Sequence, residues 1–120
     1  MYYCSMYSKE LLKGTLEVIL LKLLSEHREM YGYEITQKVK ELTEGKILLK
    51  DGSLYPLLHK MLKDGKLSFR EEANGKRIRK YYFLTNNGSE AKDNQLEEVE
   101  DFFLTMQKIL FPITPGLATA

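Results

Sequence analysis

The chain has 120 residues, of which 43% are hydrophobic and 29% charged, so we expect one globular domain and exclude a disordered or membrane-spanning protein. The net charge is +1, but residues 46–83 carry ten basic and four acidic side chains, whereas residues 1–45 sum to −1 and residues 84–120 to −4. Positive charge concentrated in the middle segment favours an anionic partner there.

Cysteine usage and hydropathy indicate the compartment. Cys4 is the only cysteine, which excludes a disulfide within the chain and fits a reducing environment. It could join two chains, although a lone cysteine near the N-terminus is more often incidental. The longest aliphatic run, residues 18–21, is far shorter than the roughly 20 residues that cross a bilayer, and no signal peptide is visible. We therefore expect a cytoplasmic protein without a membrane partner.

The first predicted helix runs without interruption from Lys9 to Glu26, after a tyrosine-rich flexible leader at residues 1–8. Its leucine, isoleucine and valine residues lie on more than one face, unlike those of a surface helix. Either it is the central helix of the domain, or another subunit covers its second face, with Leu12 and Leu16 in the interface. The small size of the domain favours the second arrangement.

A second helix is predicted from Tyr31 to about Gly45. Ile35, Val39 and Leu42 recur at helical spacing and are expected to face inward. Residues 46–50 leave room for a short extended piece before the next helix. This order of elements is the outline of a helix-turn-helix with an insertion in its turn.

The third predicted helix, within residues 51–65, has one apolar face and one face free to bind. The apolar stripe consists of Leu54, Leu57, Leu58, Met61 and Leu62, and the other face carries Ser53, Tyr55, His59, Lys60 and Lys63. Because proline is tolerated in a first turn, Pro56 predicts Ser53 as the N-cap, with Asp51 as the alternative. Asp64-Gly65 predicts the end of the helix.

This third helix suits the major groove of DNA, but its residues are also compatible with a purely structural helix. Lys60 and Lys63 can equally be solvated charges, and Tyr55 can be a half-buried ring. The helix also lacks the Arg, Asn and Gln side chains that bind bases in a bidentate manner. We therefore expect it to position the protein on a duplex more than to read many bases.

A β-hairpin is predicted after Gly65, because alternating residues flank Asn74-Gly75, a pair that accepts the positive φ angles of tight turns. The turn and second strand carry four cations close together: Lys76, Arg77, Arg79 and Lys80. Exposed strands often carry lysine simply to discourage edge pairing. Four cations in five positions exceed that need, so we interpret them as phosphate contacts.

A last helix is predicted at residues 85–110, with Thr85 as its cap and a flexible tail at residues 111–120. Its apolar residues follow the 3-4-3-4 spacing of a helix seam: Leu96, Val99, Phe103, Met106 and Leu110. The seam could pack on its own domain. Since no later element can cover it, we favour a dimerisation helix that joins two chains.

The predicted fold class is mainly α with a small two-stranded β wing. We expect a winged helix-turn-helix DNA-binding domain at residues 9–84, followed by the long helix. Enzyme signatures are absent: His27 and His59 are isolated, and no metal-ligand spacing or phosphate-binding glycine loop occurs. We expect neither an enzyme nor a cofactor or metal site.

Five segments in this order resemble the PadR family of bacterial transcriptional regulators. They are Leu12-Lys13-Gly14-Thr15-Leu16, Tyr31-Gly32-Tyr33-Glu34-Ile35, Gly52-Ser53-Leu54-Tyr55-Pro56-Leu57-Leu58, Lys63-Asp64-Gly65 and Arg79-Lys80-Tyr81-Tyr82-Phe83-Leu84-Thr85. The resemblance covers about Lys9 to Gly88, and the single last helix is similar to the short subgroup of the family.

The resemblance implies a homodimeric repressor on a two-fold DNA operator, with the first and last helices forming the dimer. On matching positions, Tyr33, Ser53, Tyr55 and the basic wing residues would contact DNA. Many family members respond to small aromatic or planar molecules near the dimer centre. This chain has no Trp to stack on such an effector, so Phe and Tyr would have to serve. The alternative is a protein-interaction or small-molecule sensing module that does not bind DNA.

Overall fold

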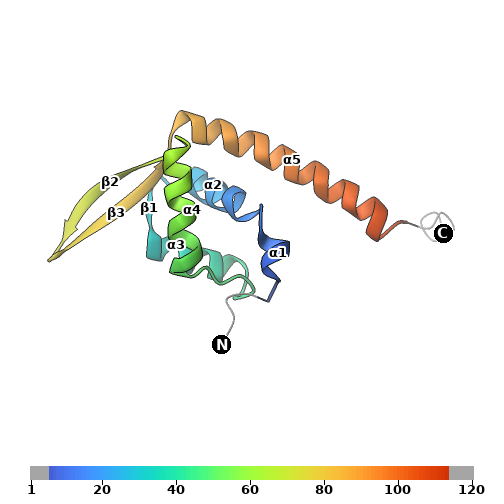
Figure 1. The fold of residues 1–120 in the computed structure, drawn as a ribbon, viewed down its shortest axis with the longest axis horizontal. Coiled ribbons are helices and arrows are strands. Elements are labelled where there is room, and N and C mark those ends of the chain that lie inside the picture. The colour runs from blue at the N-terminus through green and yellow to red at the C-terminus, as the bar shows by residue number, and fades with distance from the viewer. Residues whose placement is uncertain (1–5, 114–120) are drawn as a thin grey trace.

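The computed structural model describes residues 6–113, and the protein is elongated, with principal extents of 65 × 37 × 22 Å. Its elements in chain order are α1 (Lys9–Leu12), α2 (Leu16–Glu26), β1 (Met30–Tyr31), α3 (Gly32–Leu42), α4 (Asp51–Lys63), β2 (Leu67–Asn74), β3 (Arg77–Leu84) and α5 (Asn86–Leu110). The predicted class, a mainly helical winged helix-turn-helix with a long last helix, is confirmed (Figure 1). Most of the predicted leader and tail, with Cys4, lies outside the described residues.

The predicted continuous helix from Lys9 to Glu26 is wrong, because a turn interrupts the helix between α1 and α2. Gly14 adopts a φ of +91°, a left-handed conformation that ends a helix and that glycine accepts without strain. The Leu12 carbonyl accepts hydrogen bonds from the Thr15 N–H (3.0 Å) and the Thr15 hydroxyl (2.7 Å), which closes the turn. Helix α1 is therefore a separate short element.

Helix α2 is the central helix of the domain, which is the less favoured of the two arrangements expected from the sequence. Four of its leucines, at positions 20, 21, 23 and 24, are at most 3% exposed without any partner subunit. The core around them also contains Met30, Ile35, Val39, Leu54, Leu58, Met61, Leu67 and Tyr82. Leu42 is not part of this core: it is 63% exposed, so its predicted inward orientation is wrong.

The sheet has three strands in the order β1-β3-β2, one strand more than the predicted wing. Strand β1 pairs antiparallel with β3 through Met30↔Tyr82 and Tyr31↔Tyr81. The hairpin of β2 and β3, here called the wing, extends away from the helices (Figure 1). Its two-residue turn is Gly75-Lys76 and not Asn74-Gly75: Asn74 pairs with Arg77, and only Gly75 has a positive φ (+68°), as at the first position of a type II′ turn.

Helix α4 begins one turn earlier than predicted. Lys50 is the N-cap, and its carbonyl accepts hydrogen bonds from Ser53 N–H and Leu54 N–H, each 2.9 Å. The predictions of Ser53 as the N-cap and of Asp51 as its alternative are therefore both wrong. Pro56 lies inside the helix, where its missing N–H leaves the Gly52 carbonyl without its usual donor. The predicted end is confirmed by Gly65, with a φ of +75°.

Helix α5 has the predicted extent and cap, since the Thr85 hydroxyl accepts a hydrogen bond from Gly88 N–H (3.0 Å). Its first turns pack on α2 and on the turn after α4. The remainder extends away from the domain on the side opposite the wing (Figure 1). There, large apolar side chains are exposed: Phe102, Phe103, Leu104, Ile109 and Leu110.

Candidate nucleic-acid interface

A groove of about 710 Å³ lies between the start of α3, one flank of α4 and the wing. It is lined by Tyr31, Gly32, Tyr33, Tyr55, His59, Asn74, Arg77, Ile78, Arg79, Lys80 and Tyr82. Six of the ten predicted DNA-binding residues are among them: Tyr33, Tyr55, His59, Arg77, Arg79 and Lys80. The groove therefore combines aromatic rings and cations from segments far apart in the sequence.

Tyr55 forms the junction between α4 and α3. A Cβ added to Gly32 would overlap the Tyr55 hydroxyl, so the first turn of α3 needs glycine for this ring to lie where it does. Tyr55 stays 39% exposed, which means that the ring is half packed and half available. Tyr33, one residue beyond Gly32, is 64% exposed beside it.

Two stacked cation–aromatic pairs lie at the base of the wing: one joins β3 to β1, and the other joins β2 to β3 within the wing. The Arg79 guanidinium lies 4.0 Å from the Tyr31 ring centroid, and the Arg70 guanidinium lies 4.5 Å from that of Tyr81. Tyr31 and Tyr81 meet edge to face at 5.5 Å. Hydrogen bonding to Tyr81 raises the pKa of Arg79.

Arg70 also connects the wing to the loop before β1. Its guanidinium is 2.7 Å from Glu29 Oε2 and 3.0 Å from Glu72 Oε1. Hydrogen bonds to Glu29 and Glu72 raise the pKa of Arg70, and the bond from Arg70 lowers the pKa of Glu29. Because this ion pair is at the surface, we attribute orientation of the wing to it rather than a large share of stability.

The residues of α4 that were predicted to contact DNA lie on different sides of the helix. At about 100° per residue, His59 and Lys63 lie on the outer face beside Gly52 and Pro56, and His59 also lines the groove together with Tyr55. Ser53 is exposed but does not line the groove. Lys60 lies about 140° around the helix from Tyr55, where its Nζ is 2.9 Å from Asp64 Oδ2 and 3.8 Å from Glu17 Oε1.

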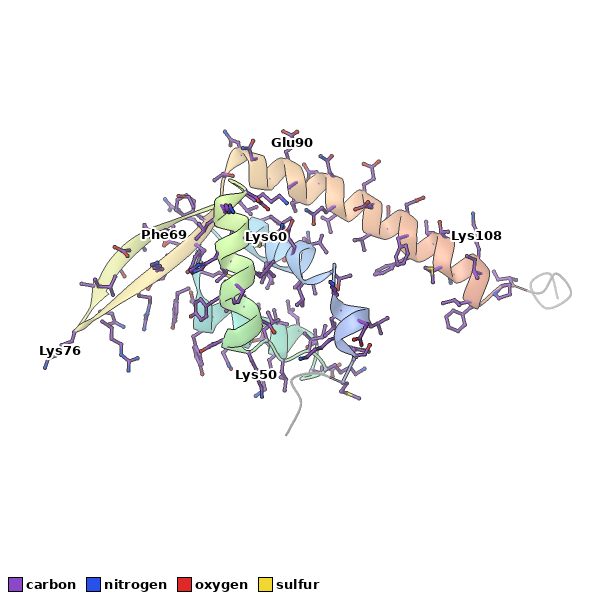
Figure 2. All side chains as sticks on the ribbon, in the orientation of Figure 1. Lys50, Lys60, Phe69, Lys76, Glu90 and Lys108 are labelled. Carbon is purple, nitrogen blue, oxygen red and sulfur yellow. The ribbon has the colours of Figure 1, made fainter. Side chains whose placement is uncertain are left out.

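The turn end of the wing carries the most available cations. Lys76 and Arg77 are exposed and have no ion-pair partner within residues 6–113. Lys76 is at the outer end of the wing, far from both ends of α4, which Lys50 and Lys60 mark in Figure 2. Lys80 differs from them, because its Nζ lies 4.6 Å from the Phe69 ring centroid. The geometry suits a long, curved polyanion that touches α4 and the wing together.

Neither a metal site nor a membrane-spanning helix is found in the described part of the chain. Residues 6–113 contain no group of three or more His, Cys, Asp or Glu side chains arranged to hold a metal ion. Within the same residues, no helix is both long and apolar enough to cross a membrane.

Residues 20–94, well over half of the chain, match the family described as "Transcriptional regulator PadR-like family". The chain belongs to this family. A regulator from Clostridium thermocellum has the same fold with a TM-score of 0.79 and 25% identity, and the match covers 85% of this chain and 99% of that one. A PadR-like transcriptional regulator from Bacillus cereus, 31% identical, gives a TM-score of 0.73 over 86% of this chain and 98% of that one.

Among curated relatives, Transcriptional regulator YqjI of Escherichia coli is 31% identical over 87 residues, which is 72% of this chain. The match spans only 40% of the length of that relative. The PadR-like chain is thus a transcriptional regulator by family, which implies DNA-binding regulation, and the family and its solved structures are regulators rather than enzymes.

Five residues that line the groove were missed by sequence reasoning: Tyr31, Gly32, Asn74, Ile78 and Tyr82. Gly32 leaves room for the Tyr55 ring, and Tyr31 stacks on Arg79. Arg70 was also missed; it lies outside the groove and joins the wing to Glu29. A signal for Gly32 existed, because glycine in a first helical turn between two tyrosines is unfavourable for the helix and suggests a close contact. Nothing in the sequence indicates the stacking of Arg70 on Tyr81.

Proposed function

We propose that this PadR-like regulator binds duplex DNA as a homodimer, with α4 as the recognition helix and the wing on the neighbouring backbone. The observation that carries the proposal is the groove, in which aromatic side chains of α3 and α4 face cations of the wing. Phosphate contacts supply most of the affinity, which therefore falls steeply with salt. Each half-site is one helical turn, roughly 10 bp, from its mate.

The contact set follows from the geometry of the single chain. Tyr33, Tyr55 and His59 line the α3–α4 side of the groove, and Arg77 and Arg79 line the wing side. Lys63, on the outer face of α4, would face the wall of the DNA major groove in the docked complex. Lys76, at the turn of the wing, contacts the backbone beyond it. We assign Ser53 to a phosphate near the start of α4, where the partial positive charge of a helix N-terminus lies.

Lys60 is the one predicted contact that we propose to exclude from the DNA surface. It is engaged with Asp64, and hydrogen bonding to that carboxylate raises the pKa of Lys60. It also leans toward Glu17 on α2, away from Tyr55. Phosphate binding there would compete with two carboxylates.

The proposed dimer uses the uncovered part of α5. Phe103 is 59% exposed, Leu110 is also exposed, and Leu96, Val99 and Met106 are half-buried in the single chain. Such a continuous apolar face along a helix is the usual signature of a protein interface. The partner that we propose for this face is a second copy of the chain, because two copies related by a two-fold axis match a two-fold operator. Leu12 and Leu16, both half-buried near the broken start of α2, would border the same interface.

Repression follows if the operator overlaps a promoter, since the bound dimer then excludes polymerase. A small aromatic effector would find Phe102 and Phe103 at the proposed seam, where their ring centroids are 6.5 Å apart. Calorimetric titration of a planar aromatic compound into the dimer tests this: heat that disappears in Phe103→Leu supports a seam site, and unchanged heat rejects it.

The proposal is tested with a duplex selected by the protein from a random-sequence pool. Tyr55→Ala, and separately the double change of Arg77 and Arg79 to Ala, are expected to weaken binding at fixed salt by tenfold or more, on the order of 1–3 kcal/mol per lost contact. Glu98→Gln on the outer face of α5 is the control and should bind like the parent. Parent-like binding by both groove variants would show that the DNA surface is elsewhere.

A further inference from the structure

Helix α5 is attached to the end of α4 at a first point, the turn at Gly65 and Lys66. The Thr85 hydroxyl donates a hydrogen bond to the Gly65 carbonyl (2.6 Å), and the Thr85 N–H donates one to the Lys66 carbonyl (3.1 Å). Gly88 lies against the same Lys66 carbonyl, so closely that a Cβ would overlap it. This attachment fixes where α5 begins, whereas the direction of α5 depends on its contacts with α2 farther along the helix.

A second attachment lies farther along α5, at the Glu17 carboxylate. Glu17 Oε2 accepts hydrogen bonds from Lys66 Nζ and Gln95 Nε2, each 2.7 Å, and Glu17 Oε1 is 3.8 Å from Lys60 Nζ. The Glu17 side chain is only 16% exposed. Its carboxylate therefore joins α2, α4, the turn after α4, and α5 in one partly buried cluster, here called the Glu17 junction.

The Glu17 carboxylate is charged at neutral pH. Burial raises the pKa of Glu17, but the hydrogen bonds from Lys66 and Gln95, with the charges of Lys66 and Lys60, outweigh burial and hold the pKa below its ordinary value. A charged, partly buried acceptor makes stronger and more directional hydrogen bonds than a neutral one.

The distances along α5 make its direction important. Gln95 is about 10 Å along the helix from Gly88, and Phe103 is about 22 Å from Gly88. A rotation of about 10° at the first attachment would move Phe103 by about 4 Å, close to the roughly 3.4 Å rise of one base pair. If two copies meet near Phe103, both helices change direction alike, so the separation of the two recognition helices changes by up to about 8 Å, or one to two base pairs.

We propose that Glu17 and Gln95 are positioning residues that set the half-site spacing accepted by the dimer, without touching DNA. The inference rests on the proposed function, since it requires both the dimer along α5 and DNA binding by α4. It also gives Lys60 a role: with Asp64 and Glu17 on either side, Lys60 joins α4 to the junction.

The experiment uses full-length protein and a series of duplexes in which the two selected half-sites are moved apart or together one base pair at a time. Gln95→Leu keeps the side-chain volume and the Glu17–Lys66 pair and removes only the hydrogen bond between α5 and Glu17. Glu17→Gln removes the charge. The matched control is Glu26→Gln, which breaks a 3.4 Å ion pair with Lys22 within α2 and involves neither α5 nor the wing.

We expect the parent to prefer one spacing. In both junction variants, the ratio of the affinity at that spacing to the affinity at neighbouring spacings should fall about fivefold, because one charge-assisted hydrogen bond is lost. Affinity for a duplex with a single half-site should not change. The Glu26→Gln control should keep the parental preference. Should Glu17→Gln fail to fold, the Gln95→Leu variant carries the test alone.

Equal weakening at every spacing, or an unchanged preference in Gln95→Leu, overturns the inference while leaving the proposed function intact. A parent protein that sediments as a monomer, or that binds duplex DNA with no salt dependence, overturns the proposed function instead, so the two failures are distinguishable.

Discussion

Replacing Gly88 by alanine should destabilise the protein, although alanine is the better helix former. The added Cβ would overlap the Lys66 carbonyl oxygen and lie 3.1 Å from a Leu84 methyl group, and the backbone of a turn held by Thr85 cannot move away easily. Overpacking of this kind costs up to about 3 kcal/mol, and the gain in helix propensity returns about 1 kcal/mol. The expected net loss is about 2 kcal/mol, or a Tm lower by roughly 8 °C.

Gly52→Ala is the matched control, because Gly52 is also helical and no atom lies within 4 Å of the position of its Cβ. That variant should be neutral or stabilised by up to about 1 kcal/mol. Urea unfolding of parent and both variants, followed by circular dichroism at one protein concentration, measures the difference. A Gly88→Ala protein as stable as Gly52→Ala would refute the close packing of α5 on the turn after α4.

Three further predictions concern the site and the Glu17 junction. Gly32→Ala should displace the Tyr55 ring and weaken DNA binding about as much as Tyr55→Ala does; a variant with parental affinity in a gel-shift titration would show that the ring position is unimportant. The pKa of Glu17 is lowered by folding, so its contribution to stability is present above its ordinary pKa and is lost as pH falls through the folded value; urea unfolding between about pH 5 and pH 3 should show a smaller loss for Glu17→Gln than for the parent, and equal losses contradict the junction. Arg77→Ala should lower the slope of log affinity against log salt by about 1, whereas Lys60→Ala should leave it unchanged; equal slopes would mean that both residues, or neither, contact phosphate.

The helices could be predicted from the sequence where their apolar residues are strictly periodic. Helix α5 has the predicted limits because Thr85 is a strong cap and the seam repeats over many residues. The break at Gly14 was missed because leucines continue on both sides of it, and periodicity alone does not reveal a left-handed residue. Strand β1 was missed because two residues are too few to show alternation, and only pairing with β3 makes them a strand.

The site was predictable in composition but not in arrangement. Aromatic and basic residues of α4 and the wing were expected to bind DNA, and six of the ten proposed residues do lie around one groove. Lys60 could not be separated from Lys63 by sequence, since both are exposed lysines on the same helix. Its partner Glu17 is 43 positions earlier, and such a long-range ion pair depends on tertiary packing. The Glu17 junction as a whole could not be predicted from the sequence for the same reason.

DNA binding through the groove is tested most directly by titrating the isotope-labelled protein with the selected duplex and following its amide chemical shifts. We expect the largest changes in α4, at the start of α3 and around the turn of the wing at Gly75, with a salt-dependent affinity. The acidic outer face of α5, around Glu98, should show none. Changes confined to α5, or changes in α4 and the wing that do not depend on salt, would contradict DNA binding through the groove.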